Sequence, residues 1–255
     1  MADAERQRIA SLEAELAAVR AEMQDFTYTV SHDLRAPLRH ILSYVQLVEE
    51  DAAHLLPDEV RGFLTVISDS AQHMGVLMDG LLELSRLGTA SVQTESVPLQ
   101  PLVQSVVDAL AQQSPERRID WQLQADMPTV QADATLLRRA LECVLDNAVK
   151  FSAQRDVAQI VVSAEHTPGE AEGTVTLRVQ DNGAGFNPAL QARLFKPFQR
   201  LHTTKQFPGI GMGLALTHKM LQRMGGTATV QGAVDAGCTL QLTLPAATRC
   251  ATSQA

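Results

Sequence analysis

The chain has 255 residues, of which 45% are hydrophobic and 20% charged, a composition typical of globular proteins with about two domains rather than of disordered or fibrous chains. Its formal net charge of -8 argues against a nucleic-acid partner and against binding to an anionic membrane surface. No apolar run approaches the roughly 18 residues that span a bilayer, and the N-terminus lacks the apolar core of a signal peptide, so we expect a cytoplasmic protein without a membrane segment. The three cysteines lack metal-ligand spacing and are expected to be thiols.

The N-terminal stretch carries apolar residues at alternating steps of three and four, which is typical of a coiled coil between two chains. A lone amphipathic helix is the alternative, but the polar residues around so narrow a stripe favour the dimer. We therefore expect residues 1–25 to form a coiled-coil linker in a homodimer. The stripe consists of Ile9, Leu12, Leu16, Val19, Met23, Phe26 and Val30.

The next segment predicts an all-α helical hairpin over residues 26–90. From Phe26 to Leu38 the apolar steps are all of four residues, a stutter that locally unwinds a coiled coil and can widen it into a bundle. A turn at 55–58 separates this helix from a second apolar helical pattern, which ends at Gly88. Two such hairpins, paired through their apolar faces, would form a dimeric four-helix bundle.

Downstream of the hairpin the pattern changes to mixed strands and helices. Helices are predicted at 97–111, 134–151 and 214–224, and strands, in which apolar and polar residues alternate, at 119–123, 159–164, 174–180 and 239–244. A stretch rich in glycine and proline at 181–213 has weak periodicity. We expect an α+β sandwich over residues 91–247, with helices on one face of the sheet, and a disordered tail at 248–255.

The segment Ser-His-Asp-Leu-Arg-Ala-Pro-Leu at 31–38 carries the first chemical signal. If Val30 and Leu34 face the core, His32 lies two residues from both and points away from it, exposed and reachable. Arg35, three residues further on, shares that face and could steady a phosphoryl group. The other histidines are expected to be ordinary surface residues: His40, His54, His73, His166, His202 and His218.

This segment resembles the H-box of sensor histidine kinases, whose pattern is Ser-His-Asp/Glu-Leu-Arg-x-Pro-Leu. The resemblance implies that a ring nitrogen of His32 attacks the terminal phosphate of ATP, with Arg35 beside it. It also implies that Asp33 orients the other ring nitrogen or accepts its proton. The segment departs from the pattern at Ala36, where many relatives carry a Thr, Asn or Gln that positions water for dephosphorylating the partner protein. We therefore predict weak phosphatase activity.

Three downstream segments suit a nucleotide. In Asn-Ala-Val-Lys-Phe at 147–151, an amide oxygen that suits Mg²⁺ and an ammonium that suits phosphate share one helix face. Asp-Asn-Gly-Ala-Gly at 181–185 follows a strand, so its carboxylate can accept a hydrogen bond from an adenine amino group, although an ordinary turn would have the same sequence pattern. The glycines at 209–213 open a helix whose N–H groups and dipole can hold phosphates.

In this order the segments are similar to the N-box and glycine motifs of the GHKL (Bergerat) ATP-binding fold, shared by histidine kinases, DNA gyrase, heat-shock chaperones and mismatch-repair ATPases. The similarity covers roughly residues 20 to 245 and implies that Asn147 is the Mg²⁺ ligand. Cys143 departs from it, because many relatives carry a further Asn there. The residues implied to bind ATP are Asn147, Lys150, Asp181, Gly183, Gly185, Phe195, Gly209, Gly211, Gly213, Leu214 and Thr239.

Phe195 belongs to a segment that looks like the family's F-box, and the polar stretch after it looks like the family's mobile ATP lid. In this stretch Arg200, His202 and Lys205 are positioned to meet phosphate or to be solvated, and for His202 we expect solvation. The sequence after His32 is also similar to that of kinases attached to phytochrome or PAS sensors.

The resemblance thus implies ATP-dependent autophosphorylation of His32 and transfer to an aspartate of a separate response-regulator receiver domain, with a sensor domain expected upstream of this chain. Two alternatives stay open: a dimeric pseudokinase scaffold, suggested by Cys143 and Ala36, and a GHKL ATPase that hydrolyses ATP without labelling itself. Whether phosphorylation runs within or across protomers depends on the hand of the loop at 55–58.

Overall fold

The structure, a computed structural model, divides into two compact units, Met1–Ala90 and Ser91–Ala255. It describes residues 2–88, 91–169, 173–203 and 206–247. The predicted disordered tail at 248–255 lies outside the described residues.

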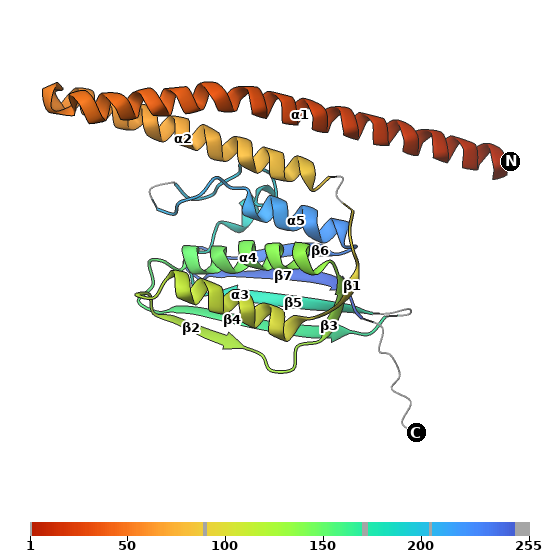
Figure 1. Ribbon diagram of the computed structural model, residues 1–255. Helices are drawn as coiled ribbons and strands as arrows, with labels where there is room; N and C mark the ends of the chain where they lie inside the picture. Colours follow the sequence, from red (N-terminus) through yellow and green to blue (C-terminus); the bar gives the residue numbers. More distant parts are fainter. Residues whose placement is uncertain (1, 89–90, 170–172, 204–205, 248–255) are drawn as a thin grey trace. The chain divides into compact units, whose positions relative to one another are not determined.

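The first unit is a helical hairpin (Figure 1). Helix α1 (Ala2–Ala52) continues through Pro37, and a short 3₁₀ turn, η1 (Ala53–Leu55), leads to α2 (Asp58–Arg86). Two acidic residues in the first turn of α2 complement the positive end of its dipole. The hairpin expected from the apolar periodicity is therefore present.

A narrow inner stripe holds the two helices of the hairpin together. Leu38 and Val45 of α1 and Ala71 of α2 are buried. Toward the open end of the hairpin Leu82 of α2 is also buried, and beyond it the Gln24 side-chain amide donates to the Ser85 carbonyl at 2.9 Å. The hairpin thus has a small apolar core of its own.

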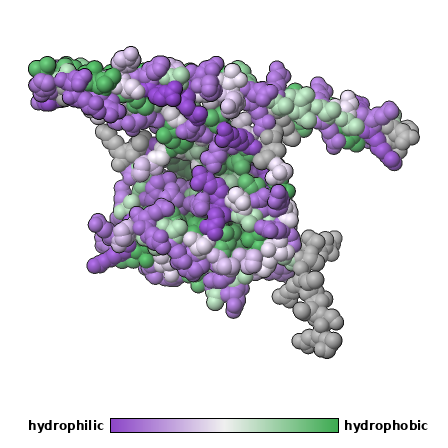
Figure 2. Space-filling model, viewed as in Figure 1, coloured by the Kyte–Doolittle hydropathy of each residue, from purple (hydrophilic) through white to green (hydrophobic). Residues whose placement is uncertain are grey.

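Most apolar side chains of the hairpin lie outside this core. Val30 and Leu34, expected to face the core, are 38% and 49% exposed, so α1 does not turn them toward α2. Phe63 and Ile67 of α2 are 57% and 45% exposed. Figure 2 shows hydrophobic side chains on the surface of the hairpin near its turn and along the N-terminal part of α1. An outer apolar face of this kind suits a second copy of the hairpin.

The second unit is a five-stranded sheet with helices α3 (Leu99–Gln113), α4 (Ala134–Phe151) and α5 (Gly213–Arg223) on one face (Figure 1). The strand order is β2-β4-β5-β7-β6; β2 pairs with β4 in parallel and the other pairs are antiparallel. The strands are β2 (Ile119–Leu123), β4 (Ala158–Thr167), β5 (Thr174–Asp181), β6 (Thr227–Gly232) and β7 (Cys238–Pro245). The predicted α+β sandwich is confirmed.

Three strands of the structure were not predicted from the sequence. β1 (Glu95–Pro98) and β3 (Thr129–Ala132) pair as a separate two-stranded sheet. Each has only four residues, which is too short for an alternation of apolar and polar residues to be recognised. β6 reads Thr-Ala-Thr-Val-Gln-Gly and offers only Ala228 and Val230 as buried apolar residues, too few to reveal a strand by alternation. Because Pro98 ends β1, α3 begins at Leu99, later than predicted. A 3₁₀ segment, η2 (Pro188–Arg193), lies in the predicted loop.

The register of α4 decides which of its side chains reach the functional site. Asp133 caps its N-terminus, accepting hydrogen bonds from the backbone of Thr135 and Leu136 at 3.0 and 3.1 Å. The apolar face from Leu137 to Leu145 is buried against the sheet. The adjoining face therefore points toward the nucleotide motifs.

Candidate nucleotide site and phospho-acceptor histidine

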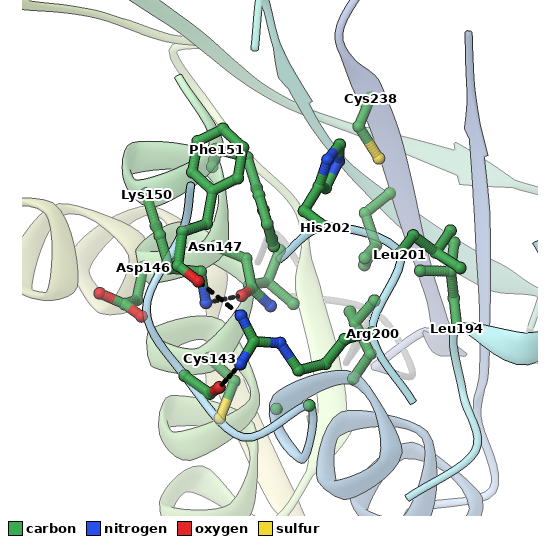
Figure 3. A pocket seen from close by; sticks show the side chains of 18 of the residues that line it. Cys143, Asp146, Asn147, Lys150, Phe151, Leu194, Arg200, Leu201, His202 and Cys238 are labelled. Carbon is green, nitrogen blue, oxygen red and sulfur yellow. Dashed lines mark hydrogen bonds between the residues drawn. The ribbon is translucent and has the colours of Figure 1, made fainter. Parts of the chain in front are cut away.

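A cavity of about 280 Å³ opens in the second unit beside α4 (Figure 3). Four stretches of chain contribute its lining, 143–151, 179–186, 194–214 and 230–240. Most of the predicted nucleotide residues line it: Asn147, Lys150, Asp181, Gly185, Gly209, Gly211, Gly213 and Leu214.

On the α4 wall the side chains of Lys150 and Asn147 meet (Figure 3), with the ammonium donating to the amide oxygen at 2.8 Å. Burial lowers the pKa of Lys150, and Arg200 lowers it further, against the opposing effect of Asp146. The Asn147 oxygen therefore accepts from a positively charged group on the cavity wall. An amide oxygen is also a suitable ligand for a divalent cation, which would take the place of the ammonium.

At the other end of the cavity lies Asp181, the last residue of β5. It is 8% exposed, and the Gly183 N–H donates to its carboxylate at 2.8 Å. Burial raises the pKa of Asp181 to about 6, although the Gly183 and Cys238 N–H groups act against the rise. Near neutral pH it is a desolvated acceptor, suited to an amino group. Burial and the nearby Asp181 raise the pKa of the Cys238 thiol to about 12, so that thiol stays protonated.

The loop after Asp181 packs tightly against the turn between β6 and β7. Gly185 has φ +59, and a Cβ there would overlap the Ala233 carbonyl. Gly237 has φ +79, and a Cβ there would overlap the Asp181 carbonyl. Both positions require glycine, and the loop at 181–185 and the turn at 233–237 pack directly against each other.

The N-terminus of α5 faces the α4 wall. A Cβ on Gly213 would lie 3.4 Å from the Asn147 amide nitrogen and 3.8 Å from the Cys143 Cβ. The first backbone N–H groups of a helix lack partners within it and attract anions. Phosphate oxygens held there would lie next to Asn147 and Lys150.

In the segment between the glycine motifs at 181–185 and 209–213, the environment of His202 differs from the one expected from the sequence. His202 is half-buried: its Nε2 lies 2.8 Å from the Gly185 carbonyl oxygen, and its ring lies 5.7 Å from that of Phe151 and 5.1 Å from that of Phe207. The expectation that it is a solvated surface residue is wrong, because Phe151 and the Gly185 carbonyl, which lie well upstream in the chain, cover the ring together with the nearby Phe207.

In the same segment Arg200 donates to the carbonyls of Gly209 at 2.5 Å and Phe207 at 2.6 Å. Phe207 is 2% exposed and lines the cavity, a role that was not predicted from the sequence. Its position directly before Pro208 and the glycines at 209–213 was the available signal. Lys205 lies outside the described residues.

Three predicted residues are not among the described residues that line the cavity. Gly183 packs against the backbone of Phe151, where a Cβ would lie 2.6 Å from the carbonyl oxygen. The Phe195 ring instead contacts His218, with 5.2 Å between ring centroids. Thr239 follows the alternation of β7: Leu240 faces the helices, so Thr239 points to the opposite side of the sheet.

The phospho-acceptor candidate lies in the first unit. His32 projects from α1 with 70% of its side chain exposed, and its Nδ1 lies 3.2 Å from the Asp33 carboxylate. The Tyr28 ring stacks on it, with 6.3 Å between centroids. Arg35 donates to Asp79 of α2 at 2.8 Å. The imidazole is thus accessible and held by an acid on one side.

Comparison with protein families gives two matches, which together cover most of the chain. Residues 22–90 match the His Kinase A (phospho-acceptor) domain. Residues 132–248 match the histidine kinase-, DNA gyrase B-, and HSP90-like ATPases.

Among curated proteins, cyanobacterial phytochrome A of Nostoc sp. is 30% identical over 237 residues, which are 93% of this chain and 30% of that protein. The methanogenesis regulatory histidine kinase FilI of Methanothrix harundinacea is 30% identical over 240 residues, 94% of this chain and 26% of that protein. The chain therefore spans less than a third of the length of these relatives.

Among solved structures, full-length ShkA in complex with AMPPNP superposes with a TM-score of 0.61 at 29% identity, over 88% of this chain and 46% of that one. The Acinetobacter baumannii histidine kinase AdeS, with a TM-score of 0.57 at 21% identity over 84% of this chain and 98% of that one, shares the fold. In the described part of the chain, no helix has the length and apolar character needed to cross a membrane.

Proposed function

We propose, from the premise that this chain belongs to the sensor histidine kinases as their catalytic core, that it transfers the terminal phosphoryl group of ATP to His32. The observation that carries the proposal is the contact between the Asp33 carboxylate and Nδ1 of an otherwise exposed imidazole. A carboxylate at this nitrogen keeps the proton there and leaves the lone pair of Nε2 available as the nucleophile.

The transfer itself is an in-line displacement. Nε2 of His32 forms a bond to the terminal phosphorus, the bond from phosphorus to the bridging oxygen breaks, and ADP leaves. The imidazole becomes positively charged as it attacks, and the carboxylate of Asp33, 3.2 Å from Nδ1, stabilises that charge. Positioning and charge stabilisation supply most of the rate enhancement in such reactions.

The cavity beside α4 would hold the nucleotide. The Asp181 carboxylate accepts a hydrogen bond from the adenine amino group, and the N-terminus of α5 with Lys150 holds the phosphates. The likeness to ShkA, whose structure is a complex with AMPPNP, supports ATP binding by this chain. Asn147 would hold Mg²⁺, which supplies charge neutralisation on the phosphates when bound.

Two chains would pair through the outer apolar face of the hairpin, giving a homodimer with a four-helix bundle. Mixing Asn147→Ala subunits with His32→Ala subunits then decides the direction of phosphorylation. Label in the mixture requires transfer across protomers, because the acceptor and the intact nucleotide site lie on different chains.

From His32 the phosphoryl group would pass to an aspartate of a separate response-regulator receiver domain. The reverse activity, dephosphorylation of that regulator, would be weak, since Ala36 offers no group to position water. Efficient dephosphorylation of a cognate phospho-regulator, undiminished in His32→Ala, would contradict this.

Incubation of the full chain with ATP labelled in the terminal phosphate tests the proposal. A kinase acquires label that is stable in base and labile in acid, and that disappears in His32→Ala. A pseudokinase scaffold binds ATP without acquiring label, and a GHKL ATPase releases phosphate without it. Either result would overturn the proposed function.

A further inference from the structure

A guanidinium group outside the cavity lining holds the loop that follows Asp181. Arg155 lies in the turn between α4 and β4, and it is not among the described residues that line the cavity. Its Nε donates to the Asn182 carbonyl at 2.8 Å, and its Nη2 donates to the Gly183 and Asp235 carbonyls at 3.0 and 2.8 Å. One side chain thus joins three backbone carbonyls from two loops.

These two loops, 181–185 and 233–237, contact each other directly. The Asp235 N–H donates to the Ala184 carbonyl at 2.8 Å, and Asp235 has a left-handed φ of 59°. The Asp235 carboxylate lies 3.9 Å from Nη2 of Arg155. A cation that serves several carbonyl oxygens makes charge-assisted hydrogen bonds, which are stronger than neutral ones.

The same peptide units link Arg155 to the candidate adenine acceptor. The N–H of Gly183 donates to the Asp181 carboxylate at 2.8 Å, and the Asn182 carbonyl, which belongs to the same planar peptide unit as that N–H, accepts from Nε of Arg155 at 2.8 Å. Fixing that carbonyl fixes the direction of the N–H, and the N–H orients the carboxylate. These contacts lie at the Asp181 end of the cavity, whereas the phosphate end is built from α4 and α5.

We propose that Arg155 is a positioning residue for recognition of the adenine base: it holds the Asp181 carboxylate in place through the 181–185 loop and does not itself bind the nucleotide. This inference rests on the proposed function, in which Asp181 accepts from the adenine amino group. The role needs the planar fork of arginine, because a lysine ammonium on a flexible stem cannot serve the three carbonyls in the same geometry.

The test compares ADP with inosine diphosphate, which lacks the amino group. Dissociation constants of both nucleotides are measured by calorimetry on the full chain, for the wild type and for Arg155→Ala and Arg155→Lys, at a temperature where circular dichroism shows each variant folded. We expect the wild type to prefer ADP by about tenfold, the value of one hydrogen bond to a charged group. In both variants the preference should fall to about twofold or less.

Arg178→Gln is the matched control, since it removes an arginine of the same unit that pairs with Glu165 at 3.1 Å on the strands β4 and β5. It should keep the wild-type preference. Equal weakening of both nucleotides in the Arg155 variants would show a merely structural role, and full recovery in Arg155→Lys would assign the effect to charge alone; either overturns the inference. A wild type without preference for ADP would instead refute the adenine contact of the proposed function.

Discussion

At the scale of single residues, the neighbour of His32 would decide which ring nitrogen reacts in the proposed phosphorylation. Side chains of adjacent helical residues do not normally face each other, yet the Asp33 carboxylate lies 3.2 Å from Nδ1. In the proposed transfer, this contact leaves Nε2 as the nucleophile. A neutral amide in place of the carboxylate would no longer stabilise the charged imidazole that forms during attack.

We expect Asp33→Asn to lower the rate of autophosphorylation by about 100-fold, the typical contribution of a positioned acid–base group, with the KM for ATP nearly unchanged because the nucleotide site lies elsewhere. Initial rates of labelling across ATP concentrations measure both. Asp69→Asn, an exposed position on α2, is the control and should label at the wild-type rate. A labelling rate in Asp33→Asn within about twofold of the wild type would refute the role.

Asp181 shows a conflict between stability and function. Its pKa is raised from 3.8 to about 6 by burial, so between these pH values the folded state holds a proton that the unfolded chain has released. The free energy of unfolding therefore falls as pH rises through this window, and it stays lower above pH 6 because the folded protein keeps a desolvated charge.

We expect Asp181→Asn to raise the free energy of unfolding by about 1–3 kcal/mol at pH 8, and by little at about pH 3, where the carboxyl is largely protonated in both states. The same variant should bind ADP at least about tenfold more weakly, because the amide can present its N–H₂ group to the adenine amino group. Urea titrations at the two pH values and calorimetry with ADP measure the two effects. A stability gain that is equal at both pH values would contradict the assignment to Asp181.

At the scale of elements, the hairpin carries more apolar surface than it buries. Leu38, Val45 and Ala71 form the inner contact, whereas Phe63 and Ile67 of α2 are about half exposed. Val30 and Leu34 follow the predicted apolar spacing but lie on the outer face rather than the inner one. The periodicity identifies an apolar stripe but not the helix that packs against it. Contacts within the chain and contacts between two chains produce the same apolar spacing.

We expect Ile67→Glu to convert the proposed homodimer into monomers at micromolar concentration, because a carboxylate buried between two apolar helix faces is strongly unfavourable. Light scattering coupled to gel filtration measures the mass. Gln72→Glu, an exposed polar position of α2, is the control for added charge and should leave the mass at that of a dimer. A dimer that persists in Ile67→Glu would exclude this face as the interface.

At the scale of the whole molecule, the chain divides into two units with separate tasks. The described residues that line the cavity belong to Ser91–Ala255, whereas His32 and Asp33 belong to Met1–Ala90. The residues proposed to bind the nucleotide and the histidine proposed to accept the phosphoryl group therefore lie in different units.

We expect residues 91–255 alone to bind ADP within about threefold of the affinity of the full chain and to acquire no label from ATP. Added hairpin, residues 1–90, should be labelled on His32 in a reaction that depends on the concentration of both pieces. Calorimetry and gel-based labelling measure these results. Loss of ADP binding in the isolated unit would show that the hairpin completes the nucleotide site.

The sequence by itself determined the family and the fold class, because both depend on features local to a short segment: the H-box spacing, the period of helices and strands, and the order of the glycine motifs. Tertiary structure decided what depends on distant segments meeting. It turned Thr239 away from the cavity, brought the Phe151 ring against those of His202 and Phe207, and joined Arg155 to the loop after Asp181. The alternation of one strand or the polarity of one side chain does not reveal these contacts, since they form only when the chain brings the partners together.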